Sequence, residues 1–134
     1  MELTEKFKQL EQNVILLREL KNDLDLEAIE QNRRYEWELR YGLFESVQII
    51  IDVSCKITNH FNLGNPKNYR ECLEFLKRFG YLDADLSKRC ISMIGLRNLL
   101  IHEYAHIDTK KLFDFLDHID DFSAFITQIQ HNLK

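Results

Sequence analysis

Polar and apolar residues alternate in steps of three and four along most of this chain, which is the spacing of one face of an α-helix. The first run predicts a helix over residues 3–24, and a second helix follows the acidic segment 25–30. The inward positions of the first helix are Phe7, Leu10, Val14, Leu17, Leu20 and Leu24. Those of the second are Leu43, Val47, Ile50, Ser54, Ile57 and Phe61, with Trp37 and Phe44 extending the stripe. The run Gly64, Asn65 and Pro66 predicts the end of the second helix.

The rest of the chain predicts three further helices. Asn68 as an N-cap, with Glu71 three positions later, predicts a short helix that stops at Gly80. A helix over about residues 83–101 is expected next, and its stripe is Leu86, Cys90, Met93, Arg97, Leu100 and Tyr104. Asp108 is a suitable N-cap for the last helix. The inner positions of that helix are Leu112, Phe115, Ile119, Phe122, Ile126 and Ile129.

These elements predict an all-α fold, an antiparallel up-and-down bundle of four or five helices joined by short loops. The chain contains only four Gly and one Pro, and its sequence has no strand pattern, repeat or low-complexity tract. A length of 134 residues is enough for one core, so residues 1–134 are expected to form a single helical bundle domain.

Composition narrows the classes of function. The chain is 45% hydrophobic and 30% charged, and its formal net charge is −4. This acidic balance argues against a protein that coats nucleic acid through bulk charge, so contact with RNA or DNA requires a local basic patch. No apolar stretch approaches about 18 residues, and the first residues lack an apolar signal core. We therefore expect a cytoplasmic protein without a membrane span.

The three cysteines, Cys55, Cys72 and Cys90, are odd in number and far apart. They form no Cys-x-x-Cys pair and no Cys/His spacing typical of a zinc site. We expect them to be small, reduced, apolar side chains, and we expect no metal.

Candidate catalytic residues gather near the end of the fourth predicted helix. Arg97, Asn98, His102 and Tyr104 occur there among apolar residues. Burying Arg or His costs free energy unless each finds a partner. A cation, an imidazole that titrates near neutral pH and a phenol together suit chemistry on a phosphate. Asn98 and His102 share one helix face. Arg97 and His102 are separated by about 140° around the axis and about 7.5 Å along it, so only the long Arg side chain can bring them together.

Spacing alone favours a structural interpretation of the same residues. Arg97 would then form an ion pair with Glu45 or Asp52. His102 would be a histidine at an interface with its hydrogen bonds satisfied, and Tyr104 a core aromatic with its hydroxyl at the edge.

A polar stripe on the second predicted helix consists of Glu45, Gln48 and Asp52. It either lines a cleft and orders Arg97 or faces solvent. Basic residues are available to bind a nucleic acid, although most such runs are solvated surface. They are Arg33, Arg34, Arg40, Lys67, Arg70, Lys77 and Arg78.

A resemblance that extends beyond these four residues favours the catalytic interpretation over the structural one. Arg97, Asn98, His102 and Tyr104 resemble the Arg-x4–6-His motif of HEPN domains, most of all the HepT type of the HEPN–MNT toxin–antitoxin modules. That type has a polar residue after the Arg and a Tyr two positions after the His. The resemblance covers roughly residues 37–125, with its closest segments at 38–45, 49–60, 68–76 and 93–108.

The resemblance implies a metal-independent ribonuclease that needs no cofactor and acts as a homodimer, with two motif helices sharing one cleft. Arg97 would stabilise charge on the phosphorus oxygens. His102 would act as general base on the ribose 2′-hydroxyl or as general acid on the leaving oxygen. Asn98 would orient His102 or a phosphate. The products would be a 2′,3′-cyclic phosphate and a 5′-hydroxyl.

The resemblance also implies two partners. One is the RNA substrate, for which tRNA and mRNA are candidates. The other is a cognate MNT-type nucleotidyltransferase antitoxin that can add AMP to Tyr104. Bulk and negative charge added at the mouth of the cleft would repel RNA.

Two other functions remain open at this point. The chain could be a non-catalytic substrate-binding or regulatory partner of a nucleotidyltransferase, or a plain helical dimerisation domain. The intact Arg97, His102 and Tyr104 favour the enzyme, whereas the acidic net charge argues mildly against phosphate binding.

Overall fold

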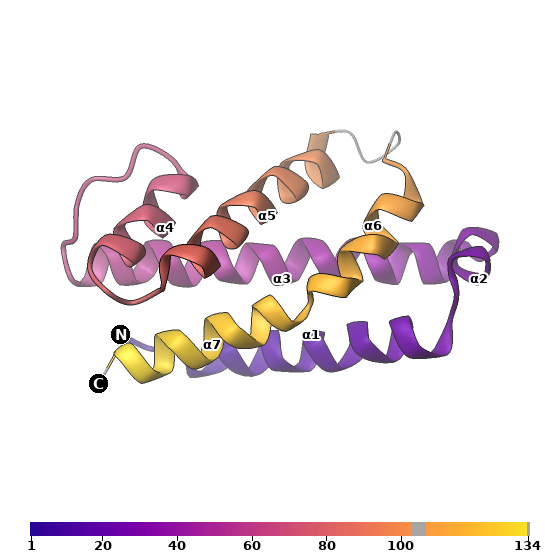
Figure 1. Ribbon diagram of the computed structural model, residues 1–134, viewed down its shortest axis with the longest axis horizontal. Helices are drawn as coiled ribbons and strands as arrows, with labels where there is room; N and C mark the ends of the chain where they lie inside the picture. Colours follow the sequence, from indigo (N-terminus) through magenta and orange to yellow (C-terminus); the bar gives the residue numbers. More distant parts are fainter. Residues whose placement is uncertain (103–106, 134) are drawn as a thin grey trace.

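The computed structural model describes residues 1–102 and 107–133, and these residues form an antiparallel helical bundle, as predicted (Figure 1). Its helices are α1 (Thr4–Asp23), α2 (Leu26–Gln31), α3 (Arg33–His60), α4 (Tyr69–Arg78), α5 (Ala84–His102), α6 (Thr109–Phe115) and α7 (Asp120–Asn132). A short 3-10 helix, Leu116–His118, joins α6 to α7. In the described residues, no helix is both long enough and apolar enough to cross a membrane.

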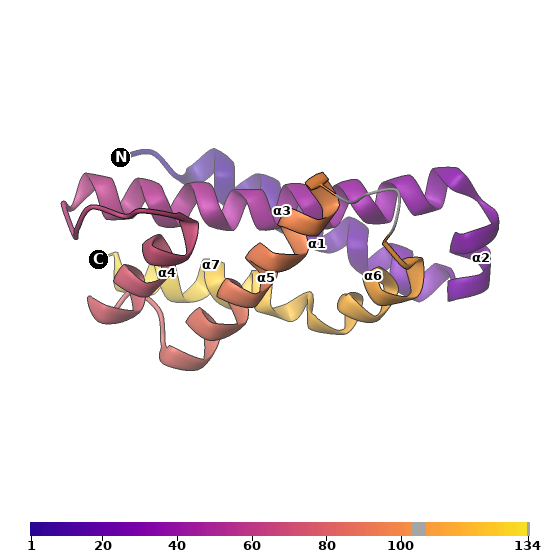
Figure 2. The same cartoon turned by 90° about the horizontal axis from the view of Figure 1, so that it is seen from above.

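Helix α3 is the longest element and the centre of the bundle. Helix α1 packs along it, and α4, α5 and α6 follow one another along its length (Figures 1 and 2). Because neighbours cover several sides of α3, the consecutive residues Ile49, Ile50 and Ile51 are all buried. Helix α7 returns beside α1, so both chain termini lie at the same end of the molecule (Figure 1).

Two helices end where a residue adopts a left-handed backbone conformation. Helix α3 ends at His60, before the predicted stop at Gly64, because Asn62 has a φ of 52°. The Leu63 amide then donates to the Thr58 carbonyl at 2.9 Å, the pattern of a Schellman motif. Gly64 has another role, since a Cβ atom there would lie 2.5 Å from Cζ of Phe75.

Helix α4 matches the prediction at both ends. The Asn68 side chain accepts from the Glu71 amide at 3.0 Å, and the Glu71 carboxylate accepts from the Lys67 amide at 2.9 Å. At the other end Gly80 has a φ of 83°, and the Tyr81 amide donates to the Leu76 carbonyl at 2.8 Å. These bonds set where α4 begins and where it stops.

The acidic segment 25–30 was expected to be a link between helices. It contains helix α2 instead. The Asp25 side chain caps this helix by accepting from the Ala28 amide at 2.9 Å, and Ile29 anchors it in the core. The predicted last helix is also interrupted. The 3-10 helix between α6 and α7 shifts the buried face from Phe115, which is only partly buried, to Leu116.

Two aromatic residues assigned to the inner stripe of α3 are exposed instead. Trp37 is 66% exposed and stacks on Tyr41, with ring centroids 6.3 Å apart. Phe61 is 43% exposed and stacks on Tyr81 at 5.8 Å. Trp37 lies near the beginning of α3, and Phe61 directly follows its last residue.

The expectation of three reduced cysteines is wrong for two of them. Cys55 of α3 and Cys72 of α4 form a disulfide, with their Cα atoms 5.0 Å apart. Cys90 is free and buried in the core, and its burial raises the pKa of the thiol to about 12. The disulfide therefore ties α4 to the central helix, while Cys90 stays protonated.

Reducing the disulfide is expected to lower the free energy of unfolding by about 3 kcal/mol, because the bond closes a loop between residues 17 positions apart. Urea unfolding of the oxidised protein, with and without a reductant, measures this. The double variant Cys55→Ser/Cys72→Ser is the control, and its midpoint should not respond to the reductant. Equal midpoints for the oxidised and reduced wild type would contradict the prediction.

Candidate active site

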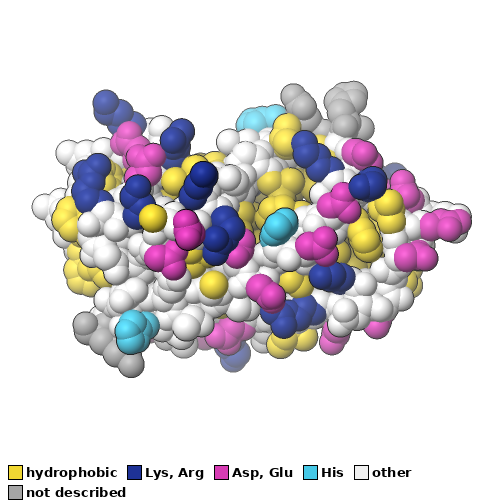
Figure 3. Space-filling view, in the orientation of Figure 1, with side chains coloured by type: hydrophobic (Ala, Val, Ile, Leu, Met, Phe, Trp, Pro, Cys, Tyr) yellow, Lys and Arg dark blue, Asp and Glu magenta, His cyan; other side chains and the backbone are white. Residues whose placement is uncertain are grey.

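Exposed basic side chains gather over α4 and the beginning of α5, although the whole chain is acidic (Figure 3). Four of the predicted basic residues belong to this group, namely Lys67, Arg70, Lys77 and Arg78. Arg33 and Arg34 lie far from it, at the beginning of α3. Arg40 is occupied, since it pairs with Glu36 and donates to the Ile107 carbonyl, each at 2.9 Å. The predicted basic set is thus divided, and α4 carries the local patch.

Arg97 lies on α5, beside this patch. The buried residues Met93, Ile94 and Leu100 fix α5 against the core, which leaves Arg97 half-buried between α3 and α4. Its guanidinium carbon lies 5.3 Å from the ring centroid of Tyr69 on α4 and 5.9 Å from that of Phe44 on α3. Such contacts hold a cation through the negative faces of the aromatic rings without neutralising its charge.

The hydrogen-bond partners of Arg97 are neutral amides. Its Nε donates to Oε1 of Gln48 at 2.9 Å, and its Nη1 donates to Oδ1 of Asn98 at 3.0 Å. The predicted alternative, an ion pair with Glu45 or Asp52, is wrong, because within the described part of the chain no carboxylate pairs with Arg97. Because its partners are neutral, the positive charge of the guanidinium is not offset by them. Its remaining N–H groups can donate to an anion.

Asp52 acts on Arg97 through Gln48. The Gln48 amide nitrogen donates to Oδ1 of Asp52 at 2.8 Å, so the amide oxygen of Gln48 faces Arg97. The other carboxylate oxygen of Asp52 pairs with Nζ of Lys6 at 3.3 Å. The negative charge of Asp52 is thus directed to a lysine of α1 rather than to the arginine of α5.

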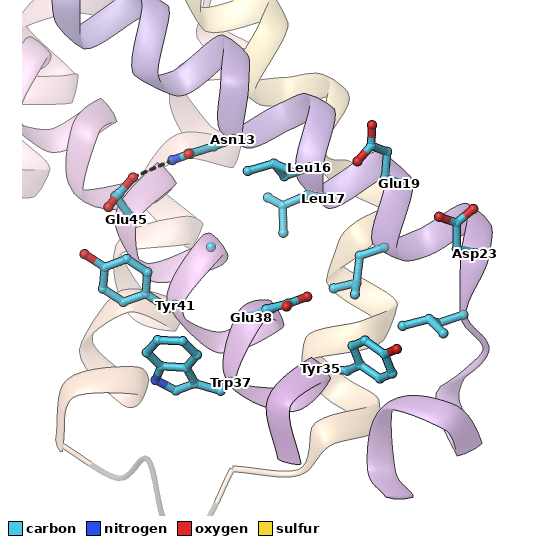
Figure 4. A pocket seen from close by; sticks show the side chains of 13 residues that line it. Asn13, Leu16, Leu17, Glu19, Asp23, Tyr35, Trp37, Glu38, Tyr41 and Glu45 are labelled. Atoms are coloured by element: carbon cyan, nitrogen blue, oxygen red, sulfur yellow. Dashed lines mark hydrogen bonds between the residues drawn. The ribbon is translucent and has the colours of Figure 1, made fainter. Parts of the chain in front are cut away.

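Glu45 serves the contact between α1 and α3. Its Oε1 accepts from Gln9 at 2.9 Å and from Asn13 at 3.0 Å, and Figure 4 shows the second of these bonds. Partial burial raises the pKa of Glu45, but hydrogen bonds from Asn13, Tyr41 and Gln9 outweigh it and leave the pKa below its usual value. Of the predicted polar stripe, Gln48 therefore contacts Arg97, Asp52 positions Gln48, and Glu45 faces α1.

His102 is the last residue of α5 and is exposed. The structure does not pair it with Asn98, whose side-chain oxygen binds Arg97 instead. Within the described residues, His102 has no hydrogen-bond partner. Tyr104 lies outside the described residues.

Sequence reasoning missed an apolar surface next to this site. A shallow hollow at the end of α5 is lined by Trp37, Arg40, Tyr41, Phe44, Leu100 and Ile101. Trp37 and Tyr41 also border a groove between α1 and α3 (Figure 4). Three of the hollow's side chains, Trp37, Tyr41 and Ile101, are exposed. The signal available in the sequence was the aromatic pair Trp37 and Tyr41 at i and i+4, of which only Trp37 was considered, as part of the inner stripe.

Metal ligands are not grouped in the part of the chain that the structure describes, where no three His, Cys, Asp or Glu side chains could hold one ion. The groups that could act on a phosphate here are the Arg97 guanidinium, the His102 imidazole and the basic side chains of α4.

The chain belongs to the HepT-like ribonuclease family, whose sequence profile matches residues 10–129. The mRNA nuclease HepT of Shewanella oneidensis is 26% identical over 102 residues, which are 72% of this chain and 77% of that protein. A similar solved structure is a tri-AMPylated Shewanella oneidensis HEPN toxin in complex with an MNT antitoxin. It has a TM-score of 0.87 and 21% identity, and the match covers 98% of this chain and 99% of the toxin.

A cytosolic protein of unknown function from Bacillus subtilis, YutE, has the same fold. Its TM-score is 0.73 at 16% identity, over 94% of this chain and 89% of that protein. At these identities the structural matches establish the fold, and they confirm the predicted HEPN-like bundle.

Proposed function

We propose that this protein is a metal-independent endoribonuclease toxin, controlled by a nucleotidyltransferase antitoxin. The observation that carries the proposal is the environment of Arg97, a half-buried cation held by the amides of Gln48 and Asn98 and by two aromatic rings. An exposed imidazole, His102, lies on the same helix. The relative from Shewanella oneidensis is an mRNA nuclease, so RNA is the proposed substrate, with mRNA favoured over tRNA.

In the proposed reaction His102 removes the proton from a ribose 2′-hydroxyl, and the oxygen attacks the adjacent phosphorus. Arg97 donates hydrogen bonds to the non-bridging oxygens, where negative charge builds up. The bond to the 5′-oxygen breaks, and that oxygen takes a proton from a second imidazole. The products are a 2′,3′-cyclic phosphate and a 5′-hydroxyl. Asn98, which holds Arg97, is a positioning residue in this scheme.

One histidine cannot easily act as base and acid in the same step. A two-fold symmetric dimer supplies two, so the proposed active unit is a homodimer in which the ends of two α5 helices share one cleft. The exposed apolar side chains of Trp37, Tyr41 and Ile101 support a contact with a second copy at this position.

The proposed control acts at Tyr104, two positions after His102. The similar toxin from Shewanella oneidensis is tri-AMPylated and bound to an MNT antitoxin. We place the corresponding modification on Tyr104, where added phosphates would repel RNA from the neighbouring Arg97 and His102. The same addition would not be expected for a plain helical dimerisation domain or for a non-catalytic regulatory partner.

Arg97→Ala and His102→Ala are each expected to lower the rate of RNA cleavage by at least about 100-fold, because each removes a group that acts in the transition state. The assay incubates purified protein with total RNA and a metal chelator. Two controls should cleave like the wild type, namely Arg18→Ala, which removes an ion pair between α1 and Asp120, and His131→Ala on α7. Equal cleavage by all variants, or none by the wild type, would contradict the proposal.

Incubation with ATP and the cognate nucleotidyltransferase is expected to increase the intact mass by adenylyl units and to abolish cleavage. Tyr104→Phe should stay unmodified because it lacks the phenolic oxygen. Tyr41→Phe, which changes another exposed tyrosine, is the matched control and should still be modified. Modification of Tyr104→Phe to the same extent as the wild type would show that the acceptor is a different residue.

A further inference from the structure

Tyr69 has no part in the chemistry proposed above, yet its ring lies directly against Arg97. It is the first residue of α4, and its ring centroid is 5.3 Å from the guanidinium carbon. The hydrogen bonds of Asn68 and Glu71 fix the backbone at this end of α4. Tyr69 is nevertheless 44% exposed, so part of it is open to solvent.

An exposed aromatic ring beside a phosphate-binding arginine has the form of a base-stacking site. Proteins that bind single-stranded RNA commonly stack unpaired bases on aromatic side chains and hold the backbone with cations. Phe44, the other ring on Arg97, is partly buried against the core and lies 6.3 Å from the Tyr41 ring, so it is less open to a base. Tyr69 is therefore the ring that a nucleobase can reach.

We propose that Tyr69 forms a nucleobase subsite, in which a base next to the phosphate held by Arg97 stacks on its exposed face. This inference rests on the proposed function, since it assumes that Arg97 holds a phosphate of RNA. The contact would select unpaired over base-paired RNA, because a base inside a duplex presents no free face. It would discriminate little among the four bases, since each has a π-face.

Lys67 is a second cation close to Tyr69 in the sequence. It precedes Tyr69 by two residues and is exposed, and its ammonium group has no partner in the described part of the chain. The guanidinium of Arg70, by contrast, is engaged by Glu74 at 2.9 Å. Lys67 is thus a candidate to bind a neighbouring phosphate of the same RNA.

The test measures binding rather than cleavage. The probes are a fluorescent 2′-O-methyl adenosine decamer, which lacks the attacking hydroxyl, and a decamer with the same backbone in which every nucleoside is abasic. Tyr69→Leu is expected to weaken binding of the adenosine decamer about tenfold and that of the abasic decamer less than about twofold. Tyr69→Phe keeps the ring and should bind both decamers like the wild type.

Two results would overturn the subsite. One is wild-type protein that binds both decamers equally well. The other is a Tyr69→Leu variant whose affinity for both decamers falls to the same extent. The ring would then serve only to hold Arg97. Because neither probe can be cleaved by 2′-hydroxyl attack, failure of this test is separate from failure of the nuclease proposal, which the cleavage of total RNA tests.

Discussion

The site depends on a half-buried positive charge, that of Arg97, whose hydrogen-bond partners in the described residues are neutral amides. A guanidinium in that position would ordinarily be expected to pair with a carboxylate, and α3 carries two candidates, Glu45 and Asp52. Neither pairs with it, because the polar side chains of α1 engage both of them. What reaches Arg97 from α3 is the neutral amide of Gln48. Among the described residues no carboxylate neutralises this cation, an environment suited to the proposed binding of a phosphate.

This arrangement follows from the way the helices meet on α3. Gln48 and Asp52 are four residues apart, so one helix face carries both the amide that contacts Arg97 and the carboxylate that orients it. Helix α1 supplies Lys6 to Asp52, while α4 brings the Tyr69 ring against Arg97. The disulfide between α3 and α4 links the two elements that carry Gln48 and Tyr69. Three helices thus contribute to the environment of a residue on a fourth.

Periodicity was sufficient to predict the long helices, because each buries a continuous stripe. It missed α2, which is short and buries only Ile29. It also placed Trp37 in the core, since a stripe cannot show where a neighbouring helix ends. The motif identified Arg97, but its partners depend on the register of α1 and α3. Similarly, Cys55 and Cys72 can pair only because α4 folds back on α3.

The most direct test of the account moves one negative charge from beside Lys6 to beside Arg97. The double variant Gln48→Glu/Asp52→Asn does this at constant net charge, and Asp52→Asn alone is its control. The carboxylate should pair with the guanidinium and compete with the phosphate. We predict that the double variant cleaves RNA at least about tenfold more slowly than Asp52→Asn, with the same helical content. Equal cleavage rates for the two variants would contradict the claim that an un-neutralised Arg97 is what makes the site work.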